Sequence, residues 1–322
     1  MMEKLKGSIN RGEVKINKKL KRKKLWSEVL RDYQLYLMLV PFVLIYLIFN
    51  YFPMYGLQMA FQDYKPYLGF TGSKWVGFKH FINFFTGPYA WRVIRNTFMI
   101  NVYELAFNFT LTIVMALLLN EIAHKKIRAA VQTVIYVPYF ISTVVVAGLV
   151  ISLLSPTSGI INLIIEKLGG ERVSFLSVPA YFKPIFVIMN GWSGIGFGTI
   201  LYTSAICGID ESLYEAAEID GAGRFAKIWH VTLPGISTTI VIMFILRMGQ
   251  MLSVGSDAIL LLYQPITYET ADVISTFVYR YGIEQGDYSF SSAVGLFNGI
   301  VALILVVTAN KISQKVSETS LW

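Results

Sequence analysis

The sequence predicts an all-α integral membrane protein with six transmembrane helices, and two observations predict that fold class. The 322-residue chain is 55% hydrophobic and only 15% charged, with a mean hydropathy of +0.55, which is too apolar for an ordinary water-soluble protein. It also contains six apolar runs long enough to cross a hydrocarbon core of about 30 Å, which takes roughly 20 helical residues. Spanning segments are expected to be helical because no backbone group can stay unpaired in lipid.

Each apolar run is interpreted as one span, and none holds more than one formal charge. The first run is not a cleaved secretory signal, because a long polar segment precedes it and no small-residue cleavage pattern follows it. We therefore expect it to stay in the mature protein. The six predicted spans are residues 35–56, 97–119, 131–154, 184–207, 235–253 and 293–310.

The basic residues predict the orientation, because short loops rich in Lys and Arg stay in the cytoplasm. Residues 1–31 hold eleven of them, and that side of the membrane receives eighteen in all against nine on the other side. Both termini are therefore predicted to be cytoplasmic. The organisation expected is a basic cytoplasmic tail at 1–31 followed by a six-span domain at 32–322.

Several function classes are disfavoured by what the sequence lacks. The net charge of +8 is attributed to topology and not to nucleic acid, since no nucleic-acid-binding module accompanies it. Three scattered histidines and a single cysteine, Cys207, predict neither a metal centre nor a cofactor site. No Gly-rich phosphate loop is present, so we expect no enzyme activity in this chain and assign any ATP hydrolysis to a partner.

The predicted cytoplasmic loop at 208–234 is the most informative segment. Asp210 or Ser212 could cap a short helix, and Gly221 and Gly223 permit a sharp turn. A second helix is expected from about Arg224 until the proline at the start of the fifth span. The result would be a helix-turn-helix outside the membrane, and an amphipathic hairpin lying on the membrane surface is the alternative.

This loop contains a motif made of Glu215, Ala216 and Ala217, then Asp220, Gly221, Ala222 and Gly223, then Leu233 and Pro234. The motif resembles the cytoplasmic coupling loop, or EAA motif, of permeases in binding-protein-dependent ABC importers. The resemblance implies the type I ABC importer permease fold and a first loop helix that docks on a separate ATPase subunit. Glu215 would face the ATPase, and Gly223 would make the turn.

Other segments carry a second resemblance, among them Asn50 to Gly56, Trp75 to Phe78, Asp272 to Thr276 and Val278 to Arg280. They resemble sugar permeases of the carbohydrate-uptake class, in the branch that imports complex or uronate-bearing oligosaccharides. The resemblance implies a bacterial cytoplasmic membrane, a second permease subunit, two ATPase subunits and an extracytoplasmic sugar-binding protein. A heterodimer of two different permeases is preferred, and a homodimer is the alternative. That binding protein would contact the outer loops, especially 62–96 and 254–292.

An oligosaccharide needs a polar path lined by aromatic side chains. For each amide that could line such a path, hydrogen bonding between helices is the competing interpretation. The candidates inside or near the spans are Asn101, Asn108, Asn190, Trp192, Tyr202 and Asn298.

Two charges fall inside spans, Glu104 in the second and Arg247 in the fifth. At about 1.5 Å per residue both lie roughly 12 Å below the outer face. Because an unpaired charge at that depth costs several kcal/mol, we expect them to pair or to line the substrate path. An unpaired Arg247 would suit a sugar carboxylate, and structural pairing is the alternative.

A different class of transporter is also considered, an ATP-independent secondary carrier. Such carriers are expected to show internal repeats and ion-coupling carboxylates near the midplane. No clear repeat is visible here, and Glu104 is the one carboxylate within a predicted span. The importer permease is therefore the preferred interpretation.

Overall fold

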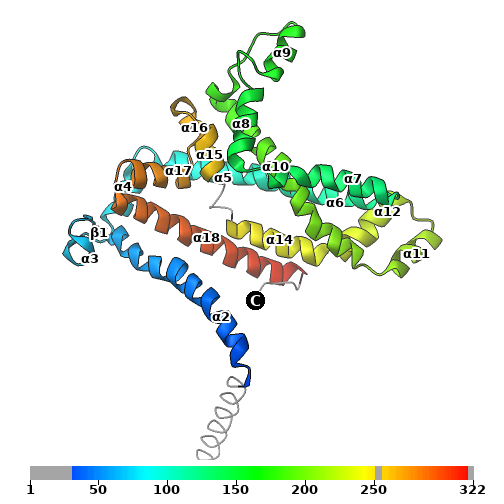
Figure 1. The fold of residues 1–322 in the computed structure, drawn as a ribbon, viewed down its shortest axis with the longest axis horizontal. Coiled ribbons are helices and arrows are strands. Elements are labelled where there is room, and N and C mark those ends of the chain that lie inside the picture. The colour runs from blue at the N-terminus through cyan, green and yellow to red at the C-terminus, as the bar shows by residue number, and fades with distance from the viewer. Residues whose placement is uncertain (1–30, 251–255, 318–322) are drawn as a thin grey trace, which may run out of the picture. The chain divides into compact units, whose positions relative to one another are not determined.

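The computed structural model describes residues 31–250 and 256–317, and these residues are mostly helical (Figure 1). The chain forms two compact units, Met1–Gln58 and Met59–Trp322. The predicted tail lies almost wholly outside the described residues, as do residues 251–253 of the fifth predicted span.

The described part of the first unit is an apolar helical segment. It comprises α2 (Tyr33–Tyr46), the π-helix η1 (Leu47–Tyr51) and the start of the 3₁₀ helix η2 (Phe52–Phe61). None of the α2 residues is buried within the chain. A helix that is apolar on every side suits a lipid environment or a further protein surface.

The second unit begins with a short connecting segment and continues into the second span. The strands β1 (Gln62–Asp63) and β2 (Lys74–Trp75) pair antiparallel, with Gln62 opposite Trp75 and Asp63 opposite Lys74. The helices of this part are α3 (Gly69–Gly72), α4 (Lys79–Thr86), α5 (Ala90–Glu104), the π-helix η3 (Leu105–Phe109) and α6 (Thr110–Asn120).

The middle of the second unit contains the third and fourth spans and the segment between them. Its helices are α7 (Lys125–Tyr136), η4 (Val137–Phe140), α8 (Thr143–Leu153), α9 (Ile160–Lys167), η5 (Phe175–Ser177) and α10 (Pro179–Cys207).

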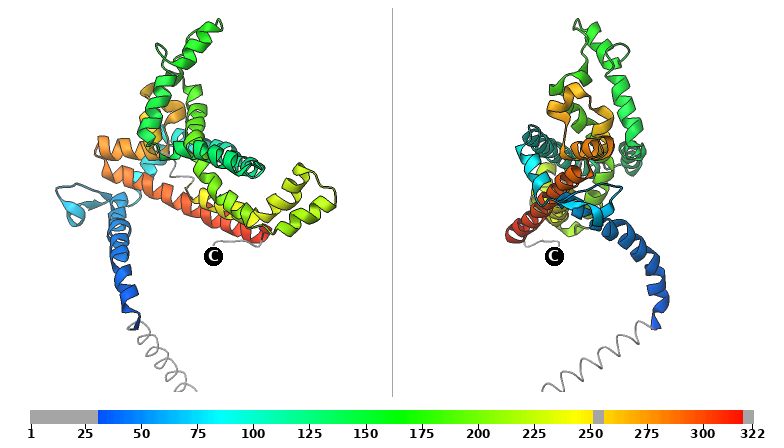
Figure 2. Two further views of the ribbon diagram at one scale, coloured as in Figure 1. Left: turned by 45° about the vertical axis from the view of Figure 1, so that its right-hand side comes forward. Right: turned by 90° about the vertical axis from the view of Figure 1, so that its left-hand side faces the viewer.

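The last part runs from the predicted coupling loop to the C-terminal helix, and α14 and α18 lie side by side (Figures 1 and 2). Its helices are α11 (Glu211–Ile219), α12 (Arg224–Lys227), η6 (Ile228–Thr232), α13 (Leu233–Gly235), α14 (Ser237–Gln250), α15 (Ser256–Leu262), η7 (Pro265–Thr267), α16 (Tyr268–Ala271), α17 (Ile274–Tyr279), η8 (Arg280–Glu284) and α18 (Tyr288–Ser317).

Within the described residues, four continuous helices are long and apolar enough to cross a membrane: Tyr33–Phe61, Ala90–Asn120, Pro179–Cys207 and Tyr288–Lys315. Two further helix pairs meet the same criteria only when each bent pair is taken as one span, which brings the number to six. The predicted spans are therefore found, four as continuous helices and two as bent pairs.

The expectation of a single helix over 131–154 is wrong. The segment bends by 98° between Phe140 and Thr143, where Pro138 lacks an N–H and Ser142 caps the next helix by accepting a bond from the Val145 N–H. The 61° bend at Ile236 lies at the start of the fifth predicted span, between the second arm of the hairpin and α14. It comes two residues after Pro234, where the sequence predicts that this span begins, and the proline ring interrupts the helical hydrogen bonds.

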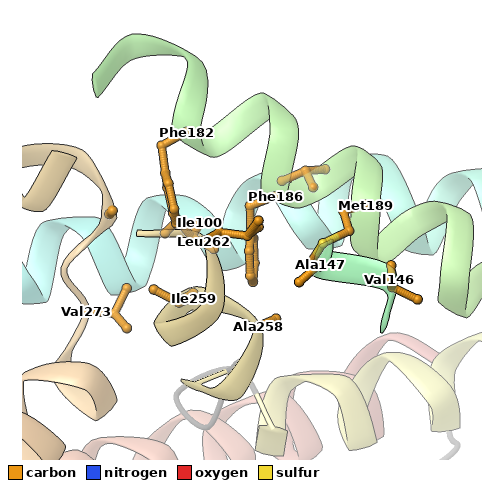
Figure 3. Close-up of a cluster of buried hydrophobic side chains, with 12 residues drawn as sticks. Ile100, Val146, Ala147, Phe182, Phe186, Met189, Ala258, Ile259, Leu262 and Val273 are labelled. Atoms are coloured by element: carbon orange, nitrogen blue, oxygen red, sulfur yellow. The ribbon is translucent and has the colours of Figure 1, made fainter. Parts of the chain in front are cut away.

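The largest buried cluster holds α10 against α5, α8 and α15 (Figure 3). Phe186 of α10 is fully buried at its centre, among Ile100 of α5 and Ile259 of α15. A second cluster packs α4 and α5 against α17 and α18 around Phe84 and Phe277. These contacts fix α5 and α10 as neighbours, and the main cavity lies further along the same two helices.

Three of the four glycines in the α10 run 191–198 mark close helix packing, as expected for small residues in a membrane helix. A Cβ at Gly191 would overlap Asn108, at Gly196 the Ile135 carbonyl, and at Gly198 the side chain of Thr112. Gly194 is different, because a Cβ there would meet nothing within 4 Å.

Candidate functional site

A cavity of about 750 Å³ lies among the second, fourth and fifth spans. This volume falls within the range of about 300–1,000 Å³ that is typical of small-molecule sites. Its wall combines one acid, one base, amides and hydroxyls with apolar side chains. The lining residues are Glu104, Asn108, Phe109, Thr112, Asn190, Gly194, Ile195, Gly198, Tyr202, Met243, Leu246, Arg247 and Gln250.

The two charges predicted within spans form an ion pair in this wall. The Arg247 Nη2 donates to Glu104 Oε2 at 2.7 Å, and the Asn190 Nδ2 donates to Glu104 Oε1 at 2.7 Å. The side chain of Glu104 is only 4% exposed, whereas that of Arg247 is 43% exposed. The pair therefore satisfies a buried carboxylate and leaves much of the guanidinium facing the cavity.

Sequence reasoning left open whether these two residues pair or line a path, and the structure shows that they pair in the wall of a cavity. Three spans contribute to the pair: α5 supplies Glu104, α10 supplies Asn190 and α14 supplies Arg247. Charge-assisted hydrogen bonds of this kind are about twice as strong as neutral ones. The arrangement ties three spans together at the cavity.

Asn108 lies on the π-helical turn η3, next to this ion pair. Its Nδ2 donates to the Val187 carbonyl of α10 at 3.2 Å, so the amide joins two helices as the competing interpretation proposed. It also lines the cavity. Single π-helical turns are rare and occur often at functional sites, which makes Asn108 a candidate for both roles.

Three of the predicted path residues do not line the cavity. Asn101 is buried and donates to the Thr97 carbonyl of its own helix at 2.5 Å. Trp192 lies two residues beyond Asn190, about 200° further around α10. It is 51% exposed and is not among the residues that line the cavity. Asn298 of α18 is also outside the lining.

Tyr202 does line the cavity, and its side chain is 2% exposed. Thr112 and Gln250 are lining residues that the sequence analysis did not single out. Thr112 could have been found, because it follows Asn108 at the four-residue helical spacing. Gln250 lies near the end of the fifth span and carries no comparable signal.

The predicted hairpin is present and begins as expected. The Asp210 side chain accepts a hydrogen bond from the Ser212 N–H at 3.0 Å and caps α11. The backbone and side-chain hydrogen bonds of Ser212 hold the pKa of Asp210 below its ordinary value. The carboxylate thus stays charged at neutral pH, where it suits the helix N-terminus.

The turn of the hairpin lies at Gly221 and not at Gly223, so the expectation for Gly223 is wrong. Gly221 has φ +79°; its N–H donates to the Glu218 carbonyl, and the Ala222 N–H donates to the Ala217 carbonyl. These two bonds form a Schellman motif, which favours glycine because of its positive φ. Gly223 has an extended backbone with φ −68° and is the N-cap of α12.

The hairpin exposes an apolar surface. Leu213 and Ile219 of α11 are 53% and 86% exposed, and Phe225 and Trp229 of the second arm are 88% and 69% exposed. We call these four residues the hairpin patch. Exposed large apolar side chains in such number on a short hairpin suit contact with a protein or a membrane.

A second ion-pair cluster lies in the segment 272–280. The fully buried Asp272 accepts from Arg280 Nη2 at 2.6 Å and from Arg92 Nη2 at 3.2 Å. The Thr276 hydroxyl donates to the other carboxylate oxygen of Asp272, Oδ1, at 3.0 Å. The cluster fastens the segment after α16 to the N-terminal part of α5, so it has a structural role in the fold.

Comparison with known proteins identifies the family. The family described as "Binding-protein-dependent transport system inner membrane component" matches residues 108–321, which is more than half of the chain. The chain belongs to this family.

Two relatives of the permease come from Bacillus subtilis (strain 168). It is 44% identical to "Protein LplB" over 298 residues, which is 92% of this chain and 94% of that protein. It is 42% identical to "Polygalacturonan/rhamnogalacturonan transport system permease protein YteP" over 307 residues, which is 95% of this chain and 96% of that protein.

Two solved structures also resemble the permease. One is a bacterial ABC transporter involved in the import of the acidic polysaccharide alginate, with TM-score 0.85, 44% identity and coverage of 91% of this chain and 99% of that one. The other is a bacterial alginate ABC transporter in complex with an alginate pentasaccharide-bound periplasmic protein, with TM-score 0.84, 44% identity and coverage of 92% and 99%.

These similarities confirm the family and the importer permease fold that the sequence predicts. The permease is a membrane component of a transport system and not an enzyme. Its apolar helices agree with a protein that crosses the membrane several times.

Proposed function

We propose that the permease is one of two membrane subunits of an ATP-driven importer of oligosaccharides, including uronate-bearing ones. The observation that carries the proposal is the cavity of about 750 Å³, which offers Arg247, amides and aromatic rings to a ligand inside a membrane protein. Sugar hydroxyls and apolar sugar faces need this combination of groups. YteP and the alginate transporter support an acidic polysaccharide as the source of the cargo.

Arg247 is the group in the cavity that suits an acidic sugar. A guanidinium carries five N–H donors, and the contact to Glu104 uses only the Nη2 nitrogen. Within the described residues, Arg247 has no other hydrogen-bond partner, and its side chain is 43% exposed. The remaining donors can bind a sugar carboxylate or hydroxyl while the ion pair stays intact.

The hairpin is proposed to dock on the ATPase, since its patch is apolar and exposed. Docking would involve the motif residues Glu215, Ala216 and Ala217, together with the connection between the two arms, where Asp220, Gly221 and Ala222 form the turn and Gly223 caps α12. The motif ends at Leu233 and Pro234 in the second arm. The hairpin and both termini are proposed to lie in the cytoplasm, with 1–31 as a tail on the domain 32–322. The second permease is proposed to be a different chain, and a sugar-binding protein would contact the outer loops 62–96 and 254–292.

The test of this assembly is purification of the C-terminally tagged permease from native membranes, with mass spectrometry of the proteins that accompany it. We expect an ATPase and a second permease. Phe225→Asp should remove the ATPase and retain the second permease, because Phe225 is 88% exposed. Leu168→Asp is the matched control, because Leu168 is 82% exposed and lies in the predicted outer segment after α9.

Transport decides between the importer and the secondary carrier. Proteoliposomes that contain the purified complex and the binding protein should take up oligosaccharide only when ATP is supplied on the ATPase side. Uptake by the permease alone without ATP would favour a secondary carrier and contradict the assignment of the hairpin.

The choice of cargo is tested with Arg247→Lys, which keeps a positive charge for Glu104 but loses the planar guanidinium. We expect uptake of uronate-bearing oligosaccharides to fall more than uptake of neutral ones. An equal loss for both would refute carboxylate recognition by Arg247 and leave the importer assignment in place.

A further inference from the structure

The two arms of the hairpin are joined by a hydrogen bond between Tyr214 and Thr232. The Tyr214 hydroxyl lies 3.0 Å from the Thr232 Oγ1, across 18 residues of sequence. The Thr232 hydroxyl donates to the Lys227 carbonyl at 3.4 Å. Either hydroxyl can donate in the bond between the arms, which is shorter than the contact of Thr232 to Lys227.

This contact lies on the buried side of the hairpin. Thr232 is 2% exposed, and Tyr214 and Ala217 are the half-buried residues of α11, whose other side chains are exposed. Within the described residues, the other polar side-chain link between the arms is the exposed Glu218–Lys227 salt bridge at 3.3 Å. Surface salt bridges contribute little, so the Tyr214–Thr232 bond is the stronger polar link.

Thr232 also lies next to the bend of the fifth span. It ends the π-helical turn η6, and four residues later Ile236 occupies the 61° bend between Arg224–Gly235 and α14. Ile236 is fully buried in a cluster with Ala116, Ile206 and Tyr202. Tyr202 lines the cavity, so packed side chains run without interruption from the bend to the cavity wall.

We infer that Tyr214 and Thr232 are positioning residues that transmit movement of the hairpin to the cavity. The inference rests on the proposed function, in which α11 docks on the ATPase. The bond opposes a tilt of α11 that η6 does not follow, so a displacement of α11 is passed on to the bend at Ile236. Tyr202 and α14, which carries Arg247, move with that bend, and the cavity changes shape.

Loss of the bond should separate ATP hydrolysis from transport. Tyr214→Phe and Thr232→Val each remove one hydroxyl and keep the size of the side chain. A net hydrogen bond is worth about 0.5–1.5 kcal/mol, so we expect the oligosaccharide transported per ATP hydrolysed to fall about two- to ten-fold. Thr232→Ser, which retains the hydroxyl, should keep the wild-type ratio.

The experiment measures uptake and ATP hydrolysis together in proteoliposomes of the complete complex. The double variant Tyr214→Phe/Thr232→Val should show no larger loss than either single variant, because both remove the same bond. Thr133→Val is the matched control, since among the described residues the Thr133 hydroxyl bonds only the Ala129 carbonyl of its own helix.

The possible results separate this inference from the function on which it rests. A wild-type complex without ATP-dependent uptake would refute the proposed function. A coupled wild-type complex whose Tyr214→Phe and Thr232→Val variants keep the wild-type ratio would overturn the inference alone. A parallel fall in hydrolysis and uptake would also overturn it, because that result indicates weaker docking and unchanged transmission.

Discussion

The ion pair in the cavity should respond unequally to loss of its two members. Arg247→Gln would leave the Glu104 carboxylate, 4% exposed, with the Asn190 amide as its remaining partner. Removing one partner of a buried pair costs about 3–5 kcal/mol, because the other charge stays buried. Glu104→Gln would leave Arg247, whose side chain is 43% exposed and can be hydrated from the cavity.

Glu104→Gln should therefore lower the free energy of unfolding less than Arg247→Gln does. The amide that Glu104→Gln introduces keeps one oxygen acceptor and loses one charge-assisted bond, which is worth about 1.5–3 kcal/mol. The double variant Glu104→Gln/Arg247→Gln should be more stable than Arg247→Gln alone, because no charge then remains buried. The three variants thus rank in an order that follows from the two exposed fractions.

The assay is the thermal unfolding midpoint of the purified complex in detergent, checked by its monodispersity after heating. Arg95→Gln is the matched control, since Arg95 is exposed on the same helix as Glu104 and has no acidic partner among the described residues. We expect the control to unfold at the wild-type temperature. Equal losses for the two single variants, or a double variant less stable than Arg247→Gln, would refute the reasoning.

Two further predictions concern helix packing and the segment 272–280. Gly196→Ala should destabilise the permease and lower its yield in the membrane, because a Cβ there would overlap the Ile135 carbonyl. Gly194→Ala should be tolerated, because a Cβ there would meet nothing within 4 Å. Equal yields of the two variants would contradict the packing argument. Asp272→Asn should lower the unfolding temperature by the equivalent of about 3–5 kcal/mol, because it removes the buried negative charge that pairs with Arg280 and Arg92. An unchanged unfolding temperature would show that this cluster adds no stability.

The sequence alone was sufficient for the features that depend on local composition. The six spans follow from apolar length, because the bilayer demands about 20 helical residues per crossing. The start of α11 follows from Asp210, whose side chain caps the helix within two residues. The family follows from the motif between Glu215 and Pro234, whose residues are close together in the chain.

The tertiary structure decided whatever depends on the rotation of one helix against another. The partners of Glu104 are 86 and 143 residues away, so neither the pair nor the cavity could be derived from spacing along the chain. Trp192 was expected in the path, but the rotation of α10 that points Asn190 at Glu104 turns Trp192 away. The 98° bend between Phe140 and Thr143 was likewise absent from the hydropathy of the third span. Hydropathy measures how apolar a segment is and not the direction in which it runs.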